Sequence, residues 1–347
     1  MYTQRTKAKF EALRGGDPIV MGIESSCDET AVAIVRGRRV LANIVASQID
    51  IHRKYGGVVP EVASRSHTDV IISCIDEALY KAELTLDQID CIGVTYGAGL
   101  IGALLVGVSA AKAICFARDI PLVKVNHIEG HICANYIDTD LKPPFISLVA
   151  SGGHTAVYKV NGYNDYEVVG ATRDDAIGEA FDKVARLLGL PYPGGPQIDR
   201  LAKEGKPTIK FYKHAKGVSA DLSLSYSGLK TAVVNFLHNA RQKNEQINVP
   251  DVCASFTAEA VDLLVDTTIV AAKREGLRTI VLAGGVAANS YLREKLKAEG
   301  EKNGFTVLYP PMSLCTDNAA MIAMRAYLSA IEGKDYADLS LNARPSL

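Results

Sequence analysis

The feature that most constrains the fold is an order of elements that occurs twice along the chain. In each half, a buried apolar strand is followed by a polar turn, a hairpin, a helix, a strand, a glycine turn, a helix, a further strand and a final helix. The first strands of the two series are residues 19–24 and 145–150, and their polar turns are residues 25–30 and 151–155. We therefore expect an α/β protein with two lobes of similar fold that face each other across a cleft.

The two lobes are expected to divide the chain unevenly. Lobe I comprises residues 18–141 and a C-terminal helix at about 316–347, and lobe II comprises residues 142–315 with an insertion at 190–250. Residues 1–17 are polar and mildly basic and lack an apolar core segment. We interpret them as a flexible extension, with a transit peptide as the less favoured alternative.

Composition limits the partners and the cellular location that we expect for the protein. The formal net charge of the 347 residues is -1, so a nucleic-acid partner would have to bind a local patch or a surface shared with another subunit. The seven cysteines are scattered without a CxxC pair, which predicts reduced thiols and a cytoplasmic location. The apolar stretch Ala98–Ala111 is too short to span a bilayer, so we expect a buried helix and no membrane partner.

His127 and His131 stand four residues apart, directly after the expected strand at 122–126. In a helix this spacing places both imidazoles on one face, where they can bind one metal ion. The equivalent place in the second half is residues 315–318, so we expect Asp317 to be the third ligand, presented across the cleft. Two histidines and a carboxylate leave coordination positions open and suit Fe(II), with zinc as the alternative. Without a metal, the two histidines would be a capped or surface pair.

Glu129 lies between these histidines but does not complete a zinc-protease motif. That motif is H-E-x-x-H, with the glutamate directly after the first histidine, whereas Glu129 comes two residues after His127. At about 100° per residue it should point away from a metal bound by the histidines.

Two glycine turns are candidates for binding a nucleotide. Ser151-Gly152-Gly153 can direct backbone N–H groups at an anion, and the alternative is an ordinary tight hairpin. Residues 284–289 (GGVAAN) can pass a base or ribose close to backbone, and the alternative is a plain strand-to-helix turn capped by Asn289. Neither turn fits the P-loop pattern.

Three further features have both a functional and a structural interpretation. Asp182 is a candidate site residue or a solvated helical residue, and residues 193–196 (PGGP) with Asp199 form a loop over a ribose or a sharp reversal. Residues 172–175 (TRDD) resemble a capping box. Residues 203–216 hold five lysines and an aromatic pair, which suits RNA or a solvated insertion equally.

Taken together, eight motifs resemble the TsaD family, once labelled glycoproteases (O-sialoglycoprotein endopeptidases), whose members complete threonylcarbamoyladenosine in tRNA. The match runs in order from about residue 19 to the C-terminus. The chain departs from the family at residues 97–99, where Gly-Ala-Gly replaces the usual Gly-Pro-Gly. The motifs are IESSCDET (23–30), YGGVVPE (55–61), HIEGH (127–131), SGGHT (151–155), GEAFDK (178–183), YPGGP (192–196), GGVAAN (284–289) and CTDN (315–318).

The resemblance implies the actin, Hsp70 and sugar-kinase fold (ASKHA, ribonuclease H-like) with a nucleotide in the cleft. It implies one divalent metal per subunit, held by His127, His131 and Asp317, and an adenylate or ATP as a substrate-type ligand. It also implies partners: tRNA, a paralogous TsaB-type subunit, a TsaE-type ATPase and a TsaC-type synthase that supplies the donor. The residues implied to hold the adenylate are Val149, Ala150, Ser151, Gly152, Gly153, Asp182, Gly195, Asp199 and Asn289.

The resulting hypothesis is an acyltransferase. It would move the threonylcarbamoyl group from threonylcarbamoyl-AMP to the exocyclic amine of adenosine 37, in tRNAs that read codons beginning with adenine. No general base stands out, and His154 and Glu24 are the candidates. The alternatives are a nucleotide-binding scaffold or ATPase without chemistry of its own, and a metallopeptidase, against which the position of Glu129 argues.

Overall fold

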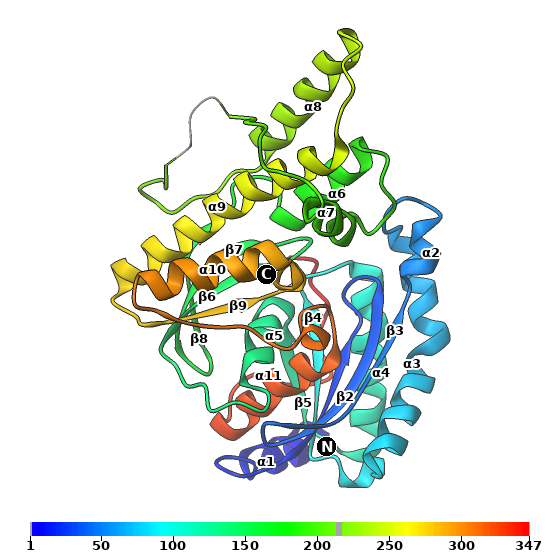
Figure 1. Ribbon diagram of the computed structural model, residues 1–347. Helices are drawn as coiled ribbons and strands as arrows, with labels where there is room; N and C mark the ends of the chain where they lie inside the picture. The colour runs from blue at the N-terminus through cyan, green and yellow to red at the C-terminus, as the bar shows by residue number, and fades with distance from the viewer. Residues whose placement is uncertain (1, 213–216, 347) are drawn as a thin grey trace. The chain divides into compact units, whose positions relative to one another are not determined.

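The computed structural model describes residues 2–212 and 217–346, which form two compact α/β units with one sheet each (Figure 1). Unit 1 comprises Met1–Lys142, Gly162–Asp165 and Thr316–Leu347, and unit 2 comprises Pro143–Asn161 and Tyr166–Cys315. Each unit has its own cluster of buried apolar side chains.

The sheet of unit 1 has the strand order β11-β5-β4-β1-β2-β3. β1 is antiparallel to β2 and parallel to β4, and β4 is parallel to β5. These strands are β1 (Ile19–Glu24), β2 (Glu29–Arg36), β3 (Arg39–Ser47), β4 (Cys91–Gly97), β5 (Leu122–Asn126) and β11 (Tyr336–Ala337). Almost every residue of β1, β2 and β4 is buried, as expected for strands covered on both faces.

Helices cover both faces of this sheet (Figure 1). Its helices are α1 (Tyr2–Glu11), α2 (Ile49–Arg53), α3 (Pro60–Ala82), α4 (Ile101–Arg118), α5 (His127–Cys133) and α11 (Ala319–Glu332), with short 3-10 turns η1 (Leu86–Gln88) and η2 (Ala134–Tyr136). α3 and α4 pack on one face and α11 on the other, so that Ile23 of β1 faces α4 while its neighbour Gly22 faces α11.

α11 lies close against the sheet because glycines leave room for it. Gly22 of β1 and Gly93 of β4 are paired in register. A Cβ on Gly22 would lie 2.5 Å from the backbone oxygen of Ala319, and one on Gly93 would lie 2.3 Å from the Cβ of Ala326. This packing fixes the start of α11, and with it the residues just before it, within unit 1.

The N-terminal extension is not a flexible tail, so that expectation is wrong for the described residues. α1 places Tyr2, Thr6 and Phe10 on one buried face. The hydroxyl of Tyr2 donates to the backbone oxygen of Ile120 at 2.8 Å, and the ring of Phe10 packs on Tyr336 with centroids 5.5 Å apart. The spacing i, i+4, i+8 is that of a helix with one apolar stripe, which anchors the segment.

Helix α4 is the one helix in residues 2–212 and 217–346 that is long and apolar enough to cross a membrane. Its composition has a simpler cause in this fold. Leu104, Val108, Ala111 and Cys115 are buried against the sheet and α3, whereas Leu105 and Phe116 are exposed, so the helix predicted to be buried is buried on one face only.

The sheet of unit 2 repeats the arrangement of unit 1. Its order is β10-β9-β6-β7-β8, which corresponds strand for strand to β5-β4-β1-β2-β3. The predicted repeat of two similar α/β lobes is therefore confirmed at the level of the sheets. The strands are β6 (Phe145–Ala150), β7 (Thr155–Gly162), β8 (Asp165–Ala171), β9 (Thr279–Ala283) and β10 (Thr306–Leu308).

The helices of unit 2 include those of the predicted insertion. They are α6 (Ile177–Leu187), α7 (Gly194–Ala202), α8 (Ser227–Gln242), α9 (Val249–Glu275) and α10 (Ser290–Lys302), with short turns η3 (Gly285–Ala288) and η4 (Met312–Leu314). The capping box predicted at 172–175 is wrong, because α6 starts later, at Ile177, and its N-cap residue makes no side-chain hydrogen bond. Asp174 instead accepts hydrogen bonds from the backbone N–H groups of Tyr226 and Ser227 at the start of α8.

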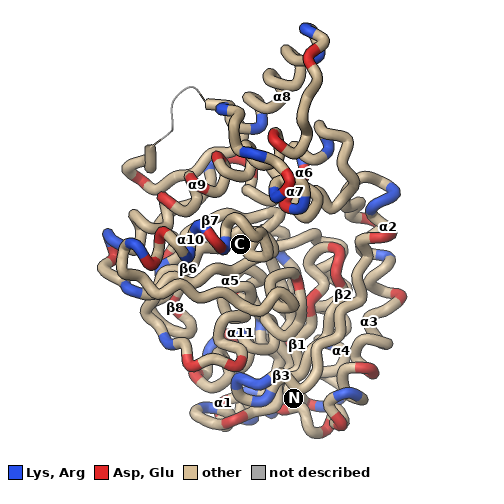
Figure 2. The backbone as a smooth tube through the Cα atoms, in the orientation of Figure 1, with Lys and Arg blue, Asp and Glu red and all other residues tan. Residues whose placement is uncertain are grey.

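The aromatic pair proposed for RNA stacking lies against the protein. Phe211 packs edge-on against Phe236 of α8, with centroids 5.7 Å apart, and Tyr212 packs on the apolar core of unit 2. Lys213, His214 and Lys216 of the same segment lie outside the described residues. Elsewhere, Lys and Arg are interspersed with Asp and Glu over both units (Figure 2), as the net charge of -1 leads one to expect.

Candidate functional site

Three side chains of unit 1 converge in a candidate metal site. Ligand atoms of His127, His131 and Asp317 all lie within 4.8 Å of one another. Oδ1 of Asp317 is 3.5 Å from Nε2 of His127 and 3.1 Å from Nε2 of His131. The two imidazole rings stand nearly perpendicular, with centroids 4.7 Å apart.

Local structure explains how the two histidines reach this point. α5 starts at His127, directly after β5, and Asn126 caps it by accepting a hydrogen bond from the N–H of Ile128 at 2.8 Å. Gly130 lies between the histidines and lets α11 approach, since a Cβ there would be 2.8 Å from Cδ1 of Ile322. Both histidines are buried, as expected for side chains between two packed helices.

Asp317 reaches the histidines from within unit 1, not from the second lobe. The expectation that it is presented across the cleft is wrong, because residues from Thr316 onward pack with the sheet that carries the histidines. Asp317 precedes the first turn of α11, which Asn318 caps by accepting from the N–H of Met321 at 3.0 Å. The close packing of α11 against Gly22 and Gly93 of the sheet therefore determines where Asp317 lies.

The surroundings of these donors fit a cation. Nδ1 of His131 has no hydrogen-bond partner although the side chain is buried, and Nε2 has only the carboxylate of Asp317 beside it, at 3.1 Å. Burial would lower the pKa of His127, but the carboxylates of Asp317 and Glu24 raise it well above its ordinary value. Burial would raise the pKa of Asp317, but the two histidines lower it. Two carboxylates around a buried histidine thus favour positive charge at this point, whether from a proton or a metal.

Glu129 has a structural role. Its Oε2 lies 2.7 Å from both Nε and Nη2 of Arg325. Arg325 is a buried side chain of α11 that also pairs with Asp335. The carboxylate therefore points away from the histidines, as the helix geometry predicts. The sequence gives no signal for its partner, because Arg325 lies 196 residues further along the chain.

The predicted adenylate residues lie in unit 2, around the end of β6. Val149 and Ala150 are fully buried and can offer only backbone, whereas Gly152 and Gly153 are exposed and have open space around them. The turn is closed by the N–H of Ser151, which donates to the backbone oxygen of His154 at 2.8 Å. His154 itself is exposed.

Two glycines of the motifs quoted above hold neighbouring elements against this turn, a packing role that sequence reasoning did not assign to them. A Cβ on Gly178 of α6 would lie 2.6 Å from the backbone oxygen of Ser151. A Cβ on Gly284, whose φ is +90°, would lie 2.4 Å from the backbone oxygen of Ala150. Both belong to motifs quoted above, but only the contacts reveal why glycine is needed there.

The remaining predicted residues are tied into the same region through hydrogen bonds. Oδ1 of Asp182 accepts from the N–H of Gly194, next to Gly195, at 2.8 Å. Oδ1 of Asp199 accepts from the N–H and the hydroxyl of Ser290 at 3.0 and 2.8 Å. Asn289 caps α10 through its Oδ1, which accepts from the N–H of Leu292 at 2.9 Å. The capping interpretation of Asn289 therefore holds for its oxygen.

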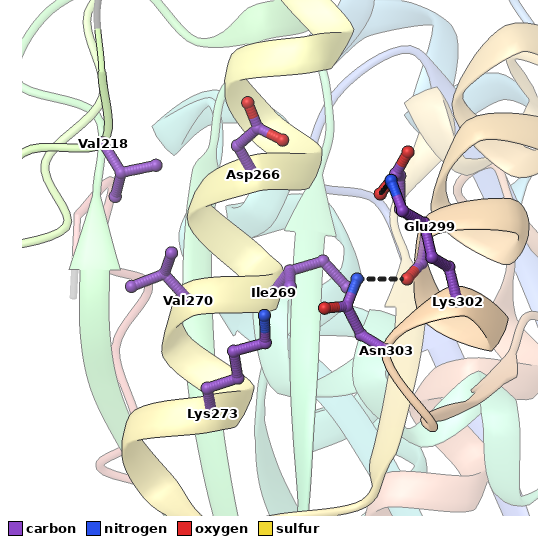
Figure 3. Close-up of a pocket in the computed structure, with 8 residues that line it drawn as sticks. All are labelled: Val218, Asp266, Ile269, Val270, Lys273, Glu299, Lys302 and Asn303. Atoms are coloured by element: carbon purple, nitrogen blue, oxygen red, sulfur yellow. Dashed lines mark hydrogen bonds and ion pairs between the residues drawn. The ribbon is translucent and has the colours of Figure 1, made fainter.

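A separate hollow of about 340 Å³ lies between α9 and α10 (Figure 3). Lys273 and Asp266 of α9 and Lys302 of α10 line it, together with Asn303, whose amide donates to the backbone oxygen of Glu299. None of the predicted site residues borders this hollow. It mixes charges of both signs, so we assign it no role in the reaction.

The half-buried carboxyl group of Glu29 should make the stability of the protein depend on pH. Burial raises the pKa of Glu29 from 4.5 to about 8, and Oε2 has no hydrogen-bond partner. Between these pH values the folded chain keeps a proton that the unfolded chain releases, so stability falls as pH rises through this window. Glu29→Gln should therefore gain stability relative to the parent from pH 5 to pH 8 and hold a constant advantage above it, as measured by urea unfolding. An unchanging difference across that range would contradict the shift.

Comparison with solved structures defines the class. The chain resembles full-length HypF in its phosphate- and nucleotide-bound form, with a TM-score of 0.62 and 14% identity over 91% of this chain and 47% of HypF. It also resembles component A of the Acidaminococcus fermentans (R)-2-hydroxyglutaryl-CoA dehydratase, with a TM-score of 0.54 and 16% identity over 90% of this chain and 98% of that one. The chain therefore shares the α/β fold of these proteins, and unit 1 of this fold carries the His–His–Asp group.

Sequence comparison is more specific. The family model TsaD, described as tRNA N6-adenosine threonylcarbamoyltransferase, matches residues 39–324. Proteins of that name from Clostridium beijerinckii and Clostridium perfringens are 54% and 56% identical over 95% of this chain and 97% of their own length. The chain belongs to the TsaD family and is a transferase that modifies tRNA. Membership implies a tRNA substrate and dependence on a metal.

Proposed function

We propose that His127, His131 and Asp317 hold one divalent metal ion, with Fe2+ as the preferred metal and Zn2+ as the alternative. The observation that carries this proposal is the convergence of three ligand atoms within 4.8 Å, in a buried place where His131 has no polar neighbour for Nδ1 and only Asp317 for Nε2. Two histidines and one carboxylate leave coordination positions open for a substrate oxygen. When bound, the metal supplies a Lewis acid that stabilises negative charge on that oxygen.

The donor in this proposal is threonylcarbamoyl-AMP, held by unit 2. Gly152 and Gly153 are exposed and carry no side chain, so their backbone N–H groups would bind its phosphate. Asp182, Gly195, Asp199 and Asn289 would contact its nucleoside. Oδ1 of Asn289 already accepts a hydrogen bond within the protein, so its NH2 group would serve the ligand. Oδ2 of Asp199 is paired with Nζ of Lys203 at 3.1 Å, so a ligand there would replace this exposed lysine as its partner.

The reaction is the transfer of an acyl group to an amine. The exocyclic nitrogen of adenosine 37 forms a bond to the carbamoyl carbon, the bond from that carbon to the phosphate oxygen breaks, and AMP leaves while the nitrogen loses one proton. An exocyclic amine is a weak nucleophile, so holding it beside the donor contributes more than base catalysis. His154 is exposed enough to take part in proton transfer, whereas Glu24 is fully buried.

We also propose that the chain works with a TsaB-type subunit, a TsaE-type ATPase and a TsaC-type synthase that makes the donor. An exposed apolar stripe on α4 supports a protein partner for unit 1. Its members Ile101, Leu105 and Phe116 are 46%, 46% and 65% exposed. Three large apolar side chains on one exposed helix face are typical of a subunit contact.

The central test is transfer to unmodified tRNA by the purified protein with its partner subunits and threonylcarbamoyl-AMP. We expect modified nucleoside, detected by mass spectrometry, to disappear after chelation and to return when Fe2+ is added. Reactions without donor, or without either partner subunit, serve as controls and should yield no product. Full activity in protein shown by elemental analysis to be free of metal would contradict the metal site and favour a nucleotide-binding scaffold.

Neither alternative function is favoured by the comparisons. A metallopeptidase would need Glu129 as its base, and this side chain is bound by Arg325. Only casein cleavage that survives repurification and is lost in His127→Ala would support a peptidase.

The seven free cysteines support a cytoplasmic location, which recovery of the protein in a membrane or extracellular fraction would contradict.

A further inference from the structure

Glu24 is a buried carboxylate that the proposed reaction does not use. It ends strand β1 and has no exposed surface. Oε2 accepts a hydrogen bond from the hydroxyl of Thr95 at 2.6 Å, and Oε1 accepts one from the N–H of Ser26. Within the described part of the chain, its one ion-pair partner is His127. Burying a carboxylate without a Lys or Arg partner is costly, so this arrangement calls for a reason beyond packing.

The contact with His127 connects Glu24 to the candidate metal site. Nδ1 of His127 is 3.1 Å from Oε2 of Glu24. The other ring nitrogen, Nε2, faces Asp317, whose Oδ1 is also the closest carboxylate atom to His131. The imidazole thus has a carboxylate hydrogen-bond partner on one side and the other two candidate ligands on the opposite side.

We propose that Glu24 is a positioning residue that prepares His127 for the metal, an inference that rests on the metal site proposed above. Accepting the proton of Nδ1–H fixes the ring in one orientation and leaves the lone pair of Nε2 directed at the ion. The negative charge of Glu24 also makes that nitrogen a better donor. Glu24 touches neither substrate nor metal in this role.

Ser26 offers a built-in comparison, because its hydroxyl oxygen is also 3.1 Å from Nδ1 of His127. A carboxylate is the stronger acceptor for the ring N–H, so Glu24 and not Ser26 should set the ring. Removing each acceptor in turn separates the two. The side-chain hydrogen bond from Thr95 to Glu24 can be removed by Thr95→Val, which keeps the shape of the side chain, the carboxylate and its bond from the N–H of Ser26.

The experiment measures Co2+ binding to metal-stripped protein by competition with a chromophoric chelator and by visible absorption of the bound ion. Glu24→Gln should weaken Co2+ binding by about 10- to 100-fold and change the spectrum, since the amide is uncharged and its NH2 group competes for Nδ1. Ser26→Ala and Thr95→Val should each change the affinity by less than about 5-fold, below the range for losing the orienting carboxylate. Unchanged affinity and spectrum in Glu24→Gln, or a larger loss in Ser26→Ala, would overturn the proposal.

Two further measurements keep the outcomes distinct. His131→Ala and Asp317→Ala lose Co2+ binding if the metal site is correct; if they bind it like the parent, the site itself is wrong, whatever Glu24 does. A second readout needs no variant and covers the case in which Glu24→Gln fails to fold. In the Zn2+-loaded parent protein, nitrogen-15 NMR of the histidine rings should show His127 protonated at Nδ1. A His127 protonated at Nε2 would refute the inference.

Discussion

Asp317→Ala is expected to lose metal binding and to reduce tRNA modification by more than about 100-fold, beyond the cost of losing an outer-shell partner of a metal. Asp317 is the only carboxylate of the three-residue group that the described residues form, and without it two histidines remain, too few to hold a divalent ion firmly. The protein should still fold, because the side chain is partly exposed and does not cap α11. Elemental analysis and the transfer assay provide the measurements.

The neighbouring residue supplies a matched control. Asn318 caps α11, so Asn318→Ala should cost about 1 kcal/mol in the free energy of unfolding while keeping all three candidate ligands. Comparing Asp317→Ala with Asn318→Ala should therefore distinguish a loss of metal binding from a loss of stability. If Asp317→Ala retained metal and activity, Asp317 would not be a ligand. If Asn318→Ala lost metal as completely, the loss in Asp317→Ala could not be assigned to the missing carboxylate.

The repeated sheet could be predicted from the sequence because its signals are local. Buried apolar runs followed by polar turns define β1 and β6 directly, glycine turns follow β4 and β9, and five strands of each sheet lie in the same order. The helix α1 had a local signal too, the stripe of Tyr2, Thr6 and Phe10, but its many charged residues obscured it.

The position of Asp317 shows where sequence reasoning stops. Symmetry between the halves selected the residue and led us to expect it across the cleft, although the expected C-terminal part of lobe I, about 316–347, already included it. What decides its position is the packing of α11 on β1 and β4, a contact between segments about 300 residues apart in the case of β1. The hydrogen bonds of Glu24 and Glu129 are similarly long-range, and no spacing in the sequence indicates them.

This dependence leads to the second large effect, in a variant that changes no candidate ligand. Gly22→Val should destabilise the protein by about 1–3 kcal/mol and weaken metal binding, because the new side chain meets the backbone of α11 at Ala319 and Ala323. Valine is favoured in β-strands, so a loss of stability in this variant cannot be attributed to a lower strand propensity. To relieve the clash α11 must shift, and Asp317 moves with it away from the histidines. Urea unfolding and Co2+ titration measure the two consequences.

Gly162→Ala is the appropriate comparison, since a Cβ there would lie 3.6 Å from the Cβ of Asp165, an ordinary contact. It should leave both stability and Co2+ affinity close to those of the parent. Gly93→Ala approaches the same helix from the adjacent strand, where the new methyl group would meet Ala326, and should reproduce the effect of Gly22→Val. If Gly22→Val or Gly93→Ala destabilised the protein yet bound Co2+ with the affinity of the parent, the packing of α11 on the sheet would not be what positions Asp317.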